Sequence, residues 1–302
     1  MQLFTAALFA LIVFAIPANA LEIQKVTDNI YAIVGPHEQR NPENFANNAT
    51  FGVIITSEGV VLVDPGGSWK GAEAIHAEIA KITDKPVKIV INSGGQDHRW
   101  LGNGYWKSKG AQIIASNNAV EDHKDRNSLQ FTILDQLLGS ALDGTDAVFA
   151  DTTFDSEYTF TLGDVSIKIF HSGHAHTPGD SYVWIADSRT VFTGDIVYVE
   201  RILGVGPQSH SGKWIETFKT MSALEPVHLI PGHGRATTLA KAKAETLDYL
   251  TNLREKIAIH IDKGGDMAGS PKVDQSAFSH LLQFKSLAGR NAQQVYSEME
   301  WE

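Results

Sequence analysis

The feature that most restricts the fold of this chain is an order of elements that occurs twice. Each half contains apolar runs of strand length separated by turn residues, then a segment whose apolar residues recur at the spacing of a helix. Another apolar run and a polar loop follow in each half. In the first half the strand runs cover 51–56, 60–64 and 87–92, and the helical segment covers 69–82. In the second half the strand runs cover 158–162, 165–170, 182–185, 191–193 and 227–230, and the helical segment covers 212–224. The pattern predicts an α/β fold, an αββα sandwich of two mixed β-sheets packed face to face with helices outside.

The chain of 302 residues contains no Pro/Gly/Ser-rich linker that would divide it. A long amphipathic helix is expected over 237–262, and more helix over 275–299. We therefore expect residues 21–302 to form one domain with a C-terminal helical extension.

Residues 1–20 are nearly all apolar and end in Ala18-Asn19-Ala20, which is typical of a signal peptide cleaved after Ala20. The prediction is an exported, periplasmic protein without stable membrane insertion after cleavage. The alternative is an uncleaved membrane anchor, because no Lys or Arg precedes the apolar run. That run is short for a membrane-spanning helix, which needs about 20 residues.

The formal net charge of -10 argues against nucleic acid as a partner, because phosphate binding needs a basic surface. The expected partner is a small-molecule substrate, and no protein partner can be named. The chain has no cysteine, so any metal must be held by His, Asp, Glu or a weaker ligand such as Gln.

Three polar segments follow predicted strands in the second half, where a scaffold presents functional groups. They contain the pair His174 and His176, the carboxylate Asp195, and His233 between two glycines. Imidazole and carboxylate are the groups that Zn²⁺ prefers when no thiolate is available. The three segments together indicate a metal site.

These segments, HAHTPGD at 174–180, VFTGD at 191–195 and IPGHG at 230–234, resemble motifs of the metallo-β-lactamase superfamily, as does LVDPG at 62–66. The resemblance covers about residues 22–302, and within the superfamily it favours exported hydrolases near the quinoprotein-associated and glyoxalase II-like groups. It implies the metallo-β-lactamase sandwich, with His176, Asp195 and His233 as metal ligands and Asp64 as a structural residue beside them.

The family's second motif, usually Thr-His-x-His-x-Asp-His, is altered in this chain. In an ungapped register, Gly94 and Gln96 replace the paired histidines, His98 replaces the aspartate and Arg99 replaces the last histidine. With one inserted residue, Asp97 and His98 form the family's Asp-His pair instead. Arginine stays protonated and cannot bind a metal, but its charge can take the place of a second cation. Either register predicts an atypical, mononuclear site.

The expected function is a metal-dependent hydrolase, with one Zn²⁺ per chain, that acts on an ester, thioester or amide-type small molecule. The alternative is a metal-poor binding protein on the same fold, which recognises a small anion or an exported oxidoreductase. The expected residues are His98, His176, Asp195 and His233 as metal ligands, Asp195 and Asp97 as catalytic carboxylates, and Arg99, Gln96 and His174 as substrate-binding groups.

Overall fold

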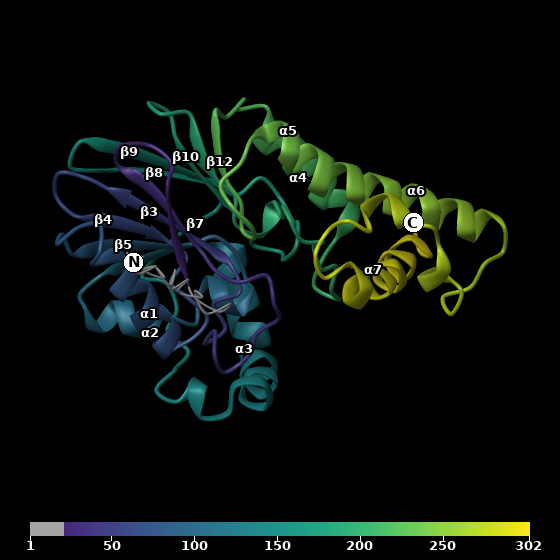
Figure 1. Ribbon diagram of the computed structural model, residues 1–302, viewed down its shortest axis with the longest axis horizontal. Helices are drawn as coiled ribbons and strands as arrows, with labels where there is room; N and C mark the ends of the chain where they lie inside the picture. The colour runs from purple at the N-terminus through teal and green to yellow at the C-terminus, as the bar shows by residue number, and fades with distance from the viewer. Residues whose placement is uncertain (1–20) are drawn as a thin grey trace, which may run out of the picture.

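The computed structural model describes residues 21–302, so the predicted signal peptide lies outside the described residues. Two β-sheets pack face to face, and helices cover their outer surfaces (Figure 1). The predicted αββα architecture is therefore confirmed. No helix in the range 21–302 is long and apolar enough to cross a membrane.

The first sheet has seven strands in the order of the chain, from β1 to β7. Strands β1 to β4 pair antiparallel, whereas β4 to β7 pair parallel, so the sheet is mixed. The strands are β1 (Glu22–Lys25), β2 (Ile30–Val34), β3 (Thr50–Ile55), β4 (Val60–Val63), β5 (Val87–Asn92), β6 (Gln112–Ser116) and β7 (Thr152–Phe154).

The second sheet has five strands in the order β12-β11-β10-β9-β8. Only β11 and β12 pair parallel. The strands are β8 (Glu157–Leu162), β9 (Val165–Phe170), β10 (Tyr182–Ile185), β11 (Thr190–Phe192) and β12 (His228–Ile230). In both sheets the parallel strands end at the loops that carry the polar motifs.

Helices α1 (Trp69–Ile79), α2 (Asn103–Ser108) and α3 (Asn117–Leu138) accompany the first sheet. Helix α4 (Ser211–Ser222) packs beside the second sheet, and α6 (Asp248–Asp262) and α7 (Phe284–Met299) extend to the right of it in Figure 1. The long helix expected over 237–262 consists of α5 (Leu239–Ala242), a π-helical turn (Lys243–Leu247) and α6. The sequence did not predict β1, β7 and α2, which are short.

The core between the sheets is apolar and fully buried. Val61 and Ile91 of the first sheet and Ile169 and Val183 of the second belong to it, and each is 0% exposed. Phe192 of β11 reaches across to Gly52 of β3, where any Cβ atom would collide with its ring. Close packing of this kind fixes the two sheets against each other and so fixes the relative positions of their loops.

Candidate metal centre

Four strand ends place the polar residues of the site close together. Asp64 follows β4, and Asp97, His98 and Arg99 form a 3-10 turn shortly after β5. In the second sheet Asp195 follows β11 and His233 follows β12. Because these four strands run parallel in pairs, their carboxyl ends meet at one edge of the sandwich.

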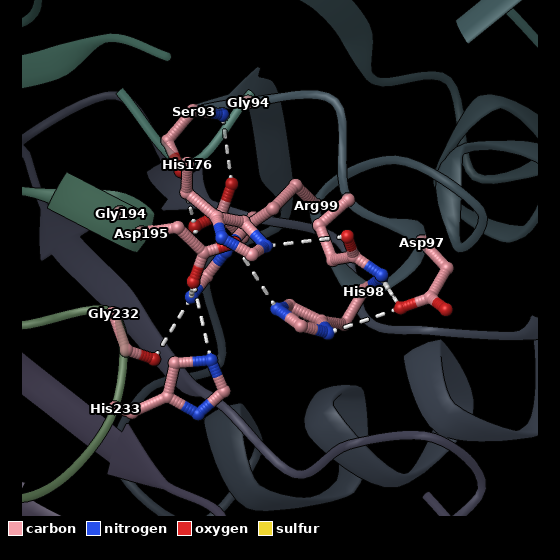
Figure 2. A network of polar contacts seen from close by, with 12 residues as sticks. Ser93, Gly94, Asp97, His98, Arg99, His176, Gly194, Asp195, Gly232 and His233 are labelled. Atoms are coloured by element: carbon pink, nitrogen blue, oxygen red, sulfur yellow. Dashed lines mark hydrogen bonds and ion pairs between the residues drawn. The ribbon is translucent and has the colours of Figure 1, made fainter. Parts of the chain in front are cut away.

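Arg99 is the centre of this cluster and is 0% exposed. Its Nη2 donates to Asp195 Oδ1 at 2.7 Å (Figure 2). Its Nη1 donates to Asp64 Oδ2, also at 2.7 Å. The same nitrogens donate to the carbonyl oxygens of Thr50 and Gly232 at 3.2 and 2.9 Å. A buried guanidinium thus joins loops from both sheets through two carboxylates.

Local backbone features make room for this guanidinium. A Cβ atom at position 232 would lie 2.6 Å from Arg99 Nη2, so only glycine fits there. Asp64 adopts a left-handed conformation with φ of 70°, which is unfavourable for a residue with a side chain. Its carboxylate accepts hydrogen bonds from Ser93 N and Ser93 Oγ, both at 2.8 Å. Asp64 is therefore a structural residue beside the site, as the resemblance implied.

His98, Asp195 and His233 form a group that could hold a metal ion, since one ligand atom from each lies within 4.8 Å of the others. His233 Nε2 is 3.1 Å from Asp195 Oδ1, and His98 Nε2 is 3.4 Å from Asp195 Oδ2 (Figure 2). All three residues are buried.

The contacts of the two imidazoles with Asp97 and Asp195 lie within ion-pair distance but lack hydrogen-bond geometry. Within the described part of the chain, both ring nitrogens of His98, both of His233, and Asp195 Oδ2 therefore have no hydrogen-bond partner. Buried polar atoms are rarely left without a partner. Burial alone would raise the pKa of Asp195, but Arg99 and His98 hold it well below its usual range, so this carboxyl group is ionised. Two imidazoles and one carboxylate with unused lone pairs fit a zinc ion.

Asp97 supports His98 from the other side. Its Oδ1 lies 3.1 Å from His98 Nδ1 and accepts a hydrogen bond from His98 N, while Oδ2 accepts one from Arg40. Burial on its own would raise the pKa of Asp97, but Arg40 and His98 outweigh it and hold the pKa far below normal. Asp97 therefore has the position of a carboxylate that orients a metal-binding imidazole.

Gly94, which replaces one of the family's paired histidines in the ungapped register, and its neighbour Gly95 lie in tightly filled space. A Cβ atom at Gly94 would collide with Asp180 Oδ1, and one at Gly95 would collide with Asp122 Oδ2. Asp180 is fully buried and accepts hydrogen bonds from Thr177 N and Thr177 Oγ1. This chain therefore fills with its own carboxylates the space that side chains at 94 and 95 would need.

Helix α3 fixes the same loop from outside. His123 Nε2 lies 2.9 Å from the carbonyl oxygen of Gly94, and both Gln130 Nε2 and Arg126 Nη2 donate to the carbonyl oxygen of Gly95. Burial lowers the pKa of His123 to about 3, so this ring is neutral and donates the bond. The loop between β5 and Asp97 is consequently held without any metal.

His176 is buried close to this group but is not part of it. Its Nδ1 lies 3.0 Å from the carbonyl oxygen of Gly204, and its Nε2 lies 3.3 Å from Gln96 Oε1. Burial lowers the pKa of His176 to about 4, which leaves the ring neutral. The Gly204 carbonyl oxygen and Gln96 Oε1 are both acceptors, so the single N–H of the neutral ring can donate to only one of them.

The other sequence-predicted residues differ in whether they line a cavity beside the metal-capable group. His174 is half-buried, with Nε2 2.7 Å from the carbonyl oxygen of Gln208, and it does not line the cavity described next. Arg99 does not line that cavity either, because its guanidinium is enclosed by protein oxygens. Gln96 and Asp97 do line it.

A cavity of about 540 Å³ opens above the group. His98 and His233 lie at its inner end together with His176 and Tyr198, and Tyr198 stacks on the His233 ring at a centroid distance of 4.3 Å. The volume is within the range of small-molecule sites. A metal held by His98 and His233 would be reached from this cavity.

Comparisons with known proteins show the family and the fold. The model of the metallo-beta-lactamase superfamily matches residues 46–233, and the chain belongs to this superfamily. A metallo-beta-lactamase type 2 from Elizabethkingia meningoseptica is 23% identical over 240 residues, which cover 78% of this chain and 87% of the relative.

Solved structures show the same fold. A metallo-beta-lactamase from Pontibacter korlensis has a TM-score of 0.60 at 19% identity, over 77% of this chain and 99% of that one. The DIM-1 metallo-beta-lactamase, in a crystal exposed to ceftazidime, has a TM-score of 0.61 at 20% identity, over 77% and 97% of the two chains. The superfamily prediction is confirmed, but these relatives are metallo-β-lactamases, so the suggested likeness to quinoprotein-associated and glyoxalase II-like groups is corrected.

Sequence reasoning missed three residues of the site region. Tyr198 and Arg201 lie in the apolar run after Asp195, where a tyrosine and an arginine among aliphatic residues were a usable signal. Arg40 lies in a polar loop before β3, and nothing in the sequence indicated that it would contact Asp97.

Proposed function

We propose that this protein is a metal-dependent hydrolase with one zinc ion per chain, held by His98, Asp195 and His233. The observation that carries the proposal is the group of buried ligand atoms without hydrogen-bond partners at the inner end of the cavity. Three protein ligands and an open position are typical of catalytic zinc sites. When bound, zinc acts as a Lewis acid that polarises a carbonyl group and favours deprotonation of water.

The surrounding residues have separate tasks in this proposal. Asp195 is both a ligand and the partner of Arg99, which fixes its orientation through a 2.7 Å contact. Asp97 orients His98, and Arg40 holds Asp97 in its ionised form. Because Asp97 lines the cavity, it also lies where it can accept a hydrogen bond from an attacking water.

The charge of Arg99 supports one metal rather than two. A guanidinium already compensates Asp195 and Asp64 in the interior, and the replaced positions Gly94 and Gln96 offer no imidazole. His176, the histidine of the third motif, lies outside the group and faces Gln96, whose amide oxygen is a weak ligand.

The substrate class we propose is an ester, thioester or amide-type small molecule. The family's hydrolytic members and the size of the cavity support this class. The relatives are metallo-β-lactamases, so β-lactam amides belong in the first substrate panel.

The test is the metal content of the purified, untagged protein by elemental mass spectrometry, together with turnover on a panel of esters, thioesters and β-lactams. We expect about one zinc per chain in the wild type, and loss of both zinc and turnover in His233→Ala. His280→Ala removes an exposed histidine outside the site and should retain both. Full zinc content in His233→Ala would refute the ligand assignment.

The same experiment addresses the alternative of a metal-poor binding protein. No zinc in the wild type, even after zinc is supplied, would favour that alternative. Two zinc ions per chain would contradict the role given to Arg99.

A further inference from the structure

The C-terminal helices contain an irregular turn. Residues Lys243–Leu247 form a π-helical turn between α5 and α6. Turns of this kind are rare, interrupt the regular hydrogen bonds of a helix and occur frequently at functional sites. This one lies outside residues 46–233, the part of the chain that the superfamily model matches. Its role therefore has to follow from the contacts that it makes in this chain.

Thr246, in this turn, binds the backbone of one residue twice. Its Oγ1 accepts a hydrogen bond from Tyr198 N at 3.0 Å and donates one to the carbonyl oxygen of Tyr198 at 2.6 Å. Thr246 is 0% exposed. The neighbouring Glu245 accepts a hydrogen bond from Glu200 N through its Oε2 at 2.6 Å. The π-helical turn thus holds the segment 198–200 through two consecutive side chains.

The other side of this segment is bonded to the strand end that carries His233. Val199 N donates to the carbonyl oxygen of His233 at 3.0 Å, and Gly232 N donates to that of Val197 at 2.9 Å. The backbone N–H and carbonyl group of Tyr198 bond to the π-helical turn instead. Tyr198 is therefore held between the C-terminal helices and the segment of His233.

The ring of Tyr198 lies against the ring of His233. The two rings are stacked, with centroids 4.3 Å apart and an angle of 15° between their planes. A metal-binding histidine usually donates its second ring N–H to a carboxylate or a carbonyl oxygen, and this bond fixes the orientation of the ring. Neither ring nitrogen of His233 has a hydrogen-bond partner within residues 21–302.

The stacked tyrosine therefore supplies the constraint that a hydrogen bond supplies elsewhere. His98 differs in this respect, because Asp97 Oδ1 lies 3.1 Å from its Nδ1. In a closely packed interior the His233 ring cannot turn without displacing the ring of Tyr198. A shift of Tyr198 would consequently change the direction of His233 Nε2, which lies 3.1 Å from Asp195 Oδ1.

We propose that Thr246 is a positioning residue for the zinc site: its two hydrogen bonds to Tyr198 hold the aromatic ring that orients His233. The inference rests on the proposed function for the zinc ion, whereas the effect of Thr246 on the His233 ring can be measured without metal. The C-terminal helices thus tune the affinity of the site for its metal, although the metal-capable group contains none of their residues.

The first measurement is zinc affinity by competition with a chelating dye. Thr246→Val keeps the shape of the side chain and removes both hydrogen bonds, and we expect it to bind zinc about 10-fold more weakly. Thr246→Ser keeps the hydroxyl group and should retain most of the affinity. Tyr198→Leu removes the ring and leaves the bonds to Thr246, and it should also weaken zinc binding. It supplies the measurement if Thr246→Val does not fold.

Thr56→Val is the matched control. Thr56 is 2% exposed, and its Oγ1 likewise donates to a backbone carbonyl oxygen, that of Gly59, and accepts from a backbone nitrogen, that of Glu58. It lies in the turn between β3 and β4, whereas Asp64 and the site lie at the other end of β4. Both valine variants should have a lower melting temperature, because backbone groups lose their partners, but only Thr246→Val should lose zinc affinity.

The second measurement is the NMR signals of the His233 ring protons in metal-free protein, identified by their absence in His233→Ala. The ring current of a stacked tyrosine moves these signals upfield. We expect them to move downfield in Thr246→Val and in Tyr198→Leu, and to stay in place in Thr56→Val.

Unchanged zinc affinity in Thr246→Val or in Tyr198→Leu would overturn the proposal, as would equal losses in Thr246→Val and Thr56→Val. Unmoved His233 signals in Thr246→Val would overturn it as well. A wild type that binds no zinc would refute the proposed function, and the His233 signals would then decide alone whether Thr246 positions this ring.

Discussion

Replacement of Arg99 by methionine tests whether the buried guanidinium holds the two halves of the site together. Arg99 is 0% exposed, and it donates four hydrogen bonds, two to carboxylates and two to backbone carbonyls. Methionine is similar in length but removes the charge and all four bonds. Asp64 and Asp195, which are 1% and 0% exposed, are then left as uncompensated buried carboxylates.

The expected cost follows from this geometry. Breaking a buried ion pair by removing one partner costs about 3–5 kcal/mol, and here one side chain serves two acids. The free energy of unfolding of natural domains is about 5–15 kcal/mol, so Arg99→Met should lose a large fraction of it. Arg99→Lys keeps the charge but lacks the planar fork that reaches both carboxylates, and it should lose less than Arg99→Met.

The assay is urea unfolding of metal-free protein at neutral pH, followed by circular dichroism. Arg235→Met is the control, because Arg235 is half exposed and pairs with Glu22 at the surface, where such pairs contribute about 0–1 kcal/mol. If Arg99→Met loses no more free energy of unfolding than Arg235→Met, the structural role of the guanidinium is refuted. If Arg99→Met does not fold, Arg99→Lys provides the measurement.

The remaining predictions concern the loop and the metal. Gly94→His should lose about 1–3 kcal/mol by overpacking against Asp180 and should gain no second metal; two metals per chain by elemental analysis would contradict this. Asp97→Asn should lower zinc affinity about 10- to 100-fold by releasing His98, measured by competition with a chelating dye; an unchanged affinity would remove the orienting role. Chelation should lower the melting temperature of the wild type but not of His233→Ala, and equal shifts in both would count against this site. Burial raises the pKa of Asp180 from 3.8 to about 8, so its contribution to stability is present below pH ~4 and is lost as the pH rises through about 8; Asp180→Asn should flatten this decline in unfolding experiments, and an unaltered slope would show that the carboxyl group titrates normally.

The loop that carries the altered second motif is held in place by neighbouring side chains of this protein. Gly94 stands where the family's motif has a histidine, and Asp180 fills the space beside it, as Asp122 does beside the adjacent Gly95. Helix α3 binds the carbonyl oxygens of both glycines. The substituted histidine and arginine, His98 and Arg99, both turn toward Asp195. The change of motif is thus accommodated by compensating side chains rather than by a collapsed site.

Local sequence patterns were sufficient for the sandwich and for most of its strands. Alternation and apolar runs predicted β3, β4, β5, β9, β10 and β12, because burial of a strand requires that pattern locally. The short strands β1 and β7 and the helix α2 were missed, since three to six residues carry too weak a periodic signal and tertiary pairing decides their state.

The sequence by itself also determined which residue types could meet at the site. Asp195 and His233 follow apolar strands, and parallel strands of one sheet must bring their ends to the same edge. The parallel pairing of β11 and β12 itself is seen only in the structure.

Only the tertiary structure decided what each polar group contacts. Arg99 could face the cavity or the protein interior, and it lies in the interior because Gly232 leaves room for it between Asp64 and Asp195. Arg201 lines the same cavity as Arg40 and Leu287, which are far from it in the sequence, and backbone bonds join its segment to Leu282. Such contacts depend on the packing of distant segments, and no local pattern of residues encodes them.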